Sequence, residues 1–141
     1  MRWLIGCLGM LLLTVSAQAD AVEARLIRAS NEKATPDAAV QDLTGKLKKV
    51  FGYQHYKQLG KEKKELKGTD VVGLNIGEGF TLFCHPKSST GKKHEMDVEM
   101  YSGKTLIVKQ EKLAIAEKNV LFIRGPEVGS TVLIVALTVT E

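Results

Sequence analysis

One segment near the start of the chain has the hydrophobic period of an α-helix. Its apolar residues recur at spacings of three, four and three, which places them on one helical face: Val40, Leu43, Leu47 and Val50. Thr35 before Pro36 is typical of an N-cap followed by the first helical residue. Gly52 suits the left-handed residue that closes a helix. The pattern therefore predicts one amphipathic helix between residues 35 and 52.

Apolar and polar residues alternate over most of the remaining chain, as they do in strands with one buried face. Polar stretches separate these segments, among them the Lys-rich run from Gly60 to Gly68 and the loop from Lys87 to Lys93. Pro86 and the pair Gly125-Pro126 predict strand ends. We expect extended segments at residues 21–29, 53–59, 71–76, 80–85, 94–101, 106–108, 113–115, 119–123 and 131–139.

The last of these segments differs from the others because it is apolar on both faces. Thr131 to Val139 is nearly continuous in valine, leucine, isoleucine and alanine, which predicts a central strand covered on both sides. With about eight or nine strands and one helix, the expected fold class is α+β. We expect mostly antiparallel β-sheet, arranged as a sandwich or roll, with the helix near the N-terminus of the mature chain.

The first nineteen residues have the features of an export signal. Arg2 precedes an apolar run from Trp3 to Val15, and Ala17-Gln18-Ala19 is a small-x-small cleavage site. Cleavage after Ala19 would leave residues 20–141 as a single globular domain. No later apolar run approaches the roughly 20 residues that a spanning helix needs. We therefore expect an exported protein, periplasmic or secreted.

Export changes the meaning of the two cysteines. Cys7 lies inside the signal, and the stretch from Leu4 to Cys7 matches a lipoprotein cleavage box. The apolar core continues past Cys7, however, which disfavours lipid anchoring. Cys84 then remains alone in the mature domain, so we expect no internal disulfide and a fold that rests on its hydrophobic core.

Positive charge is concentrated in the middle of the chain. Residues 46 to 93 contain eleven lysines against four acidic residues, whereas the segments before and after are slightly acidic. Solvated turns and edge strands are one explanation, because lysine also deters edge-to-edge pairing. The other is contact with an anionic partner of the envelope. The candidate contacts are Lys61, Lys63, Lys64, Lys67, Lys92 and Lys93. Nucleic acid is not an expected partner, because aromatic and basic residues are not interleaved along the chain.

The pair Cys84-His85 is the first candidate for chemistry, as a nucleophile with its base or as part of a metal site. Adjacent strand residues point to opposite faces, however, and Cys84 shares its face with Phe80 and Leu82. A buried, structural cysteine is the favoured interpretation. His55 and His94 are isolated in sequence, so the sequence predicts no metal site, no cofactor and no catalytic residue.

Two further groups are candidates for binding. Glu95, Asp97 and Glu99 form a carboxylate row on one strand face, for which solvent-facing charge neutralised by Lys104 or Lys109 is the favoured explanation. Tyr56 belongs to an aromatic and basic cluster at the helix exit. Packing under the helix is the favoured use of that cluster, and an outward-facing Tyr56 would instead be an anchor for a partner.

Three stretches resemble small secreted bacterial proteins of uncharacterised function. They are Val22 to Ser30, the segment from Leu43 through Phe51 to Leu59, and the ending from Gly125 to Val139. The resemblance implies a bacterial envelope or secreted setting and a non-enzymatic role, and it assigns no catalytic residues.

The sequence thus leads to two main hypotheses on function, and a stabilising subunit with no ligand of its own is a third possibility. The first is an exported, non-catalytic binding or interaction module for an unidentified protein or anionic envelope component. The alternative is a thiol- or metal-dependent envelope enzyme that uses Cys84 with a nearby histidine.

Overall fold

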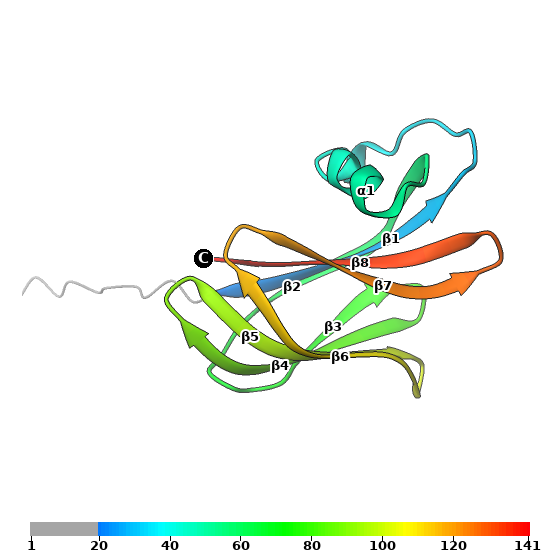
Figure 1. Ribbon diagram of the computed structural model, residues 1–141. Coiled ribbons are helices and arrows are strands. Elements are labelled where there is room, and N and C mark those ends of the chain that lie inside the picture. The colour runs from blue at the N-terminus through cyan, green and yellow to red at the C-terminus, as the bar shows by residue number, and fades with distance from the viewer. Residues whose placement is uncertain (1–19) are drawn as a thin grey trace, which may run out of the picture.

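Two antiparallel sheets of four strands each pack face to face in the computed structural model, which describes residues 20–141 (Figure 1). One sheet has the order β2-β1-β8-β7 and the other the order β3-β4-β5-β6. The strands are β1 (Ala21–Ser30), β2 (His55–Glu65), β3 (Val72–Gly77), β4 (Phe80–Thr90), β5 (Lys93–Ser102), β6 (Thr105–Ala116), β7 (Val120–Val128) and β8 (Thr131–Thr140). Residues 20–141 are therefore mostly antiparallel β-sheet, as predicted, and contain one α-helix, α1 (Thr44–Phe51).

Strand β8 lies in the middle of the first sheet, between β1 and β7. Val135 and Leu137 face the second sheet, whereas Ile134 and Ala136 face α1. The molecule consequently has two hydrophobic layers, one between the sheets and one between the first sheet and the helix (Figure 1). The prediction of a central strand covered on both sides is confirmed.

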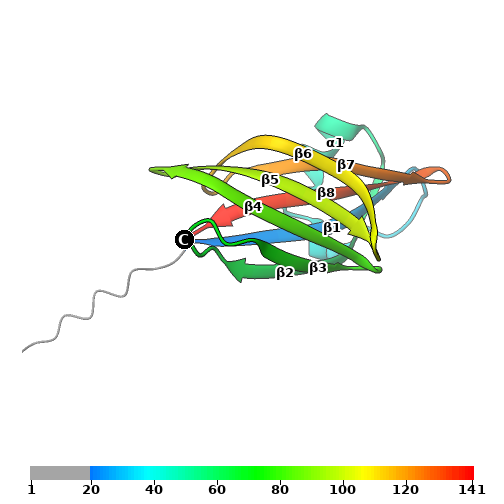
Figure 2. The ribbon, with the colours of Figure 1, turned by 90° about the horizontal axis from the view of Figure 1, so that it is seen from below.

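The second sheet is buried on its inner face only. Along β5 the residues His94, Met96, Val98 and Met100 are buried, and the residues between them lie on the outer face. This alternation follows the predicted pattern residue by residue. Figure 2 shows β4, β5 and β6 running across the face that no helix covers.

The helix begins later than predicted. Asp37, not Thr35, accepts the N–H of Ala39 and starts a 3₁₀ turn, Ala38–Val40, and α1 follows after a further turn. The helical face is then set by Leu43, Leu47 and Phe51, at spacings of four. Val50 falls off this face and is 61% exposed, contrary to the prediction. Gly52 closes the helix at φ 75°, as predicted.

Several strands continue past the residues at which the sequence predicted an end. Pro86 lies inside β4, and Gly125-Pro126 lies inside β7, because a register shift at each position lets pairing resume beyond the proline. Strand β2 runs through Gly60 to Glu65, which the sequence assigned to a Lys-rich connection. Residues 105–116 form one strand instead of two segments.

The edges of the two sheets meet where β2 passes β3, and Figure 2 shows these strands side by side. A Cβ atom on Gly60 would lie only 2.2 Å from the carbonyl oxygen of Ile76, so only glycine permits this approach. Further along, the Glu62 carboxylate accepts the N–H of Asn75, and Lys64 donates to the carbonyl of Gly73 over 2.7 Å. Side chains thus seal this margin of the sandwich.

Residues 1–19, which include the predicted export signal and Cys7, lie outside the described part of the chain. Within residues 20–141, no helix has the length and apolar character needed to cross a membrane.

Candidate functional site

His94 is a polar residue on an otherwise apolar strand face. It opens the inner face of β5, in line with Met96 and Val98, and only 6% of it is exposed. A buried imidazole needs polar partners. Side chains next to the start of β1 and the end of β6 supply these partners.

Two carboxylates converge on the same nitrogen of this ring. His94 Nε2 lies 3.1 Å from Asp20 Oδ2 and 3.4 Å from Glu117 Oε1. The side chain of Glu117 is only 5% exposed and that of Asp20 is 28% exposed. The three ligand atoms lie within 4.8 Å of one another, so the cluster has the composition and compactness of a metal site. We call it the Asp20–His94–Glu117 cluster.

Backbone hydrogen bonds hold the three elements that supply these side chains. Leu66 donates its N–H to the Asp20 carbonyl over 2.8 Å, which ties the start of β1 to the end of β2. Glu117 donates its N–H to the Lys92 carbonyl, also over 2.8 Å, which fixes the turn after β6 beside the β4–β5 hairpin. Lys118 then takes a left-handed φ of 68°, which turns the chain into β7. Backbone hydrogen bonds at the strand ends therefore fix the positions of the residues in the cluster.

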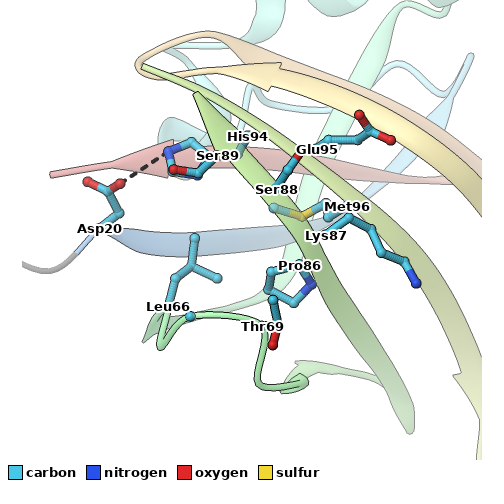
Figure 3. Close-up of a pocket in the computed structure, with 11 residues that line it drawn as sticks. Asp20, Leu66, Thr69, Pro86, Lys87, Ser88, Ser89, His94, Glu95 and Met96 are labelled. Atoms are coloured by element: carbon cyan, nitrogen blue, oxygen red, sulfur yellow. Dashed lines mark ion pairs between the residues drawn. The ribbon is translucent and has the colours of Figure 1, made fainter. Parts of the chain in front are cut away.

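A pocket of about 330 Å³ opens beside the cluster. Asp20 and His94 form part of its wall (Figure 3). The loop after β2 contributes Leu66 and Thr69. The hairpin of β4 and β5 contributes polar side chains on the other side: Lys87, Ser88, Ser89 and Glu95. We call this part of the molecule the pocket end.

The six candidate lysines divide into two groups. Lys61, Lys63 and Lys64 lie on the edge strand β2, where Lys63 is opposite Glu23 and Lys64 binds a carbonyl of β3. The second group lies at the pocket end, in the loop after β2 and at the tip of the β4–β5 hairpin: Lys67, Lys92 and Lys93. All three are exposed, and none forms an ion pair with a carboxylate of residues 20–141.

Tyr56 does not face outward. It is 3% exposed beneath α1, where its hydroxyl donates to the Leu47 carbonyl over 3.0 Å and accepts the N–H of Tyr53. Burial raises the pKa of the Tyr56 hydroxyl above its ordinary value. The structure thus places Tyr56 in the packing under the helix, the use that the sequence favoured, and it is no longer a candidate anchor for a partner.

Cys84 and His85 point to opposite faces of the second sheet. Cys84 is fully buried in the layer between the sheets, and burial raises the pKa of its thiol to about 12. The ring of His85 lies on the outer face, with Nε2 at 3.3 Å from Glu99 Oε1 but without a hydrogen bond to it. On the inner face, His94 lies four residues along β5 from Val98, the partner of Cys84. That offset is roughly 13 Å by strand rise, too far for a thiol–imidazole pair.

Two of the three carboxylates in the row on β5 lie beside side chains of β4. Asp97 lies 3.4 Å from the Lys87 amine and accepts the N–H of Lys112, which lowers its pKa, the bond from Lys112 being the larger cause. Glu99 accepts the Tyr101 hydroxyl over 2.8 Å and faces His85. The predicted partners differ, since Lys109 pairs with Glu111 and Lys104 forms no ion pair among the described residues. The row is surface charge, as the sequence favoured.

Sequence reasoning missed the Asp20–His94–Glu117 cluster. One signal was available, because His94 stands at an apolar position of a strand that alternates without error. Asp20 and Glu117 carry no such signal, since their proximity arises only when the first and sixth strands pack against the fifth.

Comparisons with known proteins assign no function to this site. No family model matches the chain, and neither a curated protein nor a solved structure matches it. The resemblance to small secreted bacterial proteins therefore assigns no role to any residue of the site.

Proposed function

We propose that this chain is an exported, non-catalytic binding module of α+β class, with its helix near the N-terminus of the mature domain. Its ligand is an anionic component of the bacterial envelope, bound at the pocket end. The observation that carries the proposal is the group of exposed lysines at that end, Lys67, Lys92 and Lys93, which have no carboxylate partner among residues 20–141.

Electrostatics supports a surface contact of this kind. Lysines without a nearby carboxylate keep their full attraction for an external anion. Each lysine near an anionic surface contributes about 1 kcal/mol, which corresponds to about 100-fold in affinity for three. The contact acts over about 8 Å at physiological ionic strength, so it weakens as salt is added.

The burial of Cys84 argues against catalysis by this thiol. A thiol with a pKa of about 12 is protonated at neutral pH, and the thiolate is the nucleophilic form. Its place between the sheets also removes it from the pocket end. The alternative hypothesis, an envelope enzyme that uses Cys84 with a histidine, therefore gains no support from the geometry.

Co-sedimentation with vesicles tests the proposal. Vesicles of anionic phospholipid and vesicles of neutral phospholipid are compared at low and at physiological salt, and fragments of an acidic cell-wall polymer are used in a parallel series. The protein should bind one of the two anionic probes, more weakly as salt rises. The triple variant Lys67→Gln, Lys92→Gln, Lys93→Gln should bind about 100-fold more weakly.

A matched variant separates location from total charge. Lys46→Gln, Lys49→Gln and Lys104→Gln remove the same charge from exposed lysines of α1 and of the β5–β6 turn. This variant should bind within about threefold of the parent protein, because its substitutions lie away from the pocket end. Equal losses in both triple variants, or binding to neither anionic probe at low salt, would contradict the proposal.

A further inference from the structure

We infer that the Asp20–His94–Glu117 cluster is a binding site for a divalent transition metal, with Zn²⁺ as the best match. The inference goes beyond the proposed function, because it involves none of the exposed lysines. It rests on the number of groups that meet at one nitrogen, on their spacing, on their charge and on the space beside them.

The meeting of three groups at one atom is the first argument. His94 Nε2 is close to both Asp20 Oδ2 and Glu117 Oε1, and a ring nitrogen carries at most one proton. One N–H therefore cannot give both carboxylates a well-aligned hydrogen bond. Among residues 20–141, Glu117 has no other side-chain partner, although its carboxylate is almost fully buried. A cation between the three atoms would satisfy all of them together.

The spacing agrees with a tetrahedral ion. Zinc lies about 2.0–2.1 Å from histidine nitrogen and about 2.0–2.2 Å from carboxylate oxygen, so neighbouring ligand atoms are roughly 3.3–3.5 Å apart. The observed separations of 3.1 and 3.4 Å from His94 Nε2 are close to these edges, and all three atoms lie within 4.8 Å. Only small side-chain movements are needed to complete the geometry.

Charge gives the second reason. Two carboxylates outnumber the single imidazole, so without a metal ion the cluster places excess negative charge in a largely buried position. A divalent cation with a neutral imidazole and two carboxylates gives a net charge of zero, which is the less costly arrangement away from water.

The ligand set favours a transition metal over the alkaline-earth ions. Imidazole suits zinc, copper, iron and nickel, whereas calcium takes six to eight oxygen ligands. Three protein ligands leave a fourth tetrahedral position, and the pocket beside Asp20 and His94 provides room for water or a ligand atom there (Figure 3).

Isothermal titration calorimetry with Zn²⁺ tests the site. The protein is purified in the form that the expressing cell exports, and intact mass spectrometry identifies its N-terminal residue. The metal-stripped protein should bind one Zn²⁺ and should not bind Mg²⁺ or Ca²⁺ at the same concentrations. His94→Gln and Glu117→Gln should each weaken Zn²⁺ binding by about 100-fold or more, since even residues that only orient a ligand account for 10- to 100-fold.

His55→Gln is the matched control, because it removes another histidine at a position away from the cluster. It should bind Zn²⁺ as the parent does. If His94→Gln fails to fold, as judged by circular dichroism, Glu117→Gln and Asp20→Asn provide the same test without loss of the ring. Absence of Zn²⁺ binding at about 1 mM would overturn the inference, and so would equal affinity in the parent and in folded cluster variants. Neither result bears on the lysine-dependent binding of anionic vesicles, so the two proposals fail separately.

Discussion

The buried side chains of Tyr56 and His94 are satisfied in very different ways. Tyr56, under α1, donates to one backbone carbonyl and accepts from one backbone N–H, so its hydroxyl is fully used by the fold. His94, at the pocket end, is surrounded by two carboxylates that compete for a single ring nitrogen. The tyrosine hydroxyl serves a structural contact, whereas a bound cation would satisfy the histidine nitrogen and both carboxylates of the cluster together.

The surroundings of the two residues reinforce this difference. Tyr56 lies among apolar side chains that include Leu47 and Ile134. His94 lines a pocket, and the exposed Lys92 and Lys93 directly precede it in the chain. Buried polar groups can be compared by how completely the fold itself satisfies them, and by that criterion we propose the pocket end as the functional region.

The largest change in stability should come from shortening an apolar side chain that packs around Tyr56. Leu47→Ala removes a fully buried side chain under α1 and should reduce the free energy of unfolding by about 3 kcal/mol, measured by urea denaturation. Val50→Ala, on the same helix but 61% exposed, should change it by less than about 0.5 kcal/mol. Similar losses in both variants would mean that α1 does not pack as described.

A smaller loss should follow from removing only the tyrosine hydroxyl. Tyr56→Phe leaves the N–H of Tyr53 and the carbonyl of Leu47 without this partner, so we expect a loss of about 1–2 kcal/mol in the free energy of unfolding. Zn²⁺ affinity should be unchanged. A neutral substitution would show that the hydroxyl is not a structural contact.

At the pocket end, in contrast, removing one charged group should leave the free energy of unfolding nearly unchanged. With a chelator present, Glu117→Gln should alter the free energy of unfolding by less than about 0.5 kcal/mol, because it relieves the excess negative charge around His94. A purely structural ion pair would instead lose about 3–5 kcal/mol when one buried partner is removed. A loss of that size would identify the cluster as a structural ion pair.

The smallest effect concerns Cys84, a third buried group. Burial raises the pKa of its thiol from 9.0 to about 12, so the folded chain should resist iodoacetamide at pH 8 and react only after unfolding in urea. Because the pKa is raised in the folded state, the associated stability is complete below pH 9 and is lost as the pH rises toward 12. Rapid alkylation of the native protein would contradict this burial and restore the thiol-enzyme hypothesis.

Local patterns allowed much of the sheet structure to be predicted from the sequence. The alternation of β5 and the two-sided apolar run of β8 each result from burial along a single strand, so the pattern alone is informative. Pro86 does not end β4, because it still lies opposite Met96 and a bulge at Lys87 lets pairing continue at Ser88. The start of the helix was misplaced because Asp37 also accepts the N–H of Gln58 on β2, a contact distant in sequence.

The candidate site was less predictable, because its residues are distant in sequence and come together only in the folded domain. Lysine clustering is visible in composition, but only the fold separates Lys64, which binds the carbonyl of Gly73, from Lys67, Lys92 and Lys93 at the pocket end. The convergence of Asp20, His94 and Glu117 depends on three strand ends that meet only in the folded domain.

Backbone amide chemical shifts recorded by NMR during a Zn²⁺ titration test the contrast between His94 and Tyr56 most directly. We expect changes confined to the pocket end, largest at Asp20, His94 and Glu117, with the amides of Tyr53 and Tyr56 unchanged. No change at the cluster, or changes under α1 as large as those at the cluster, would contradict it.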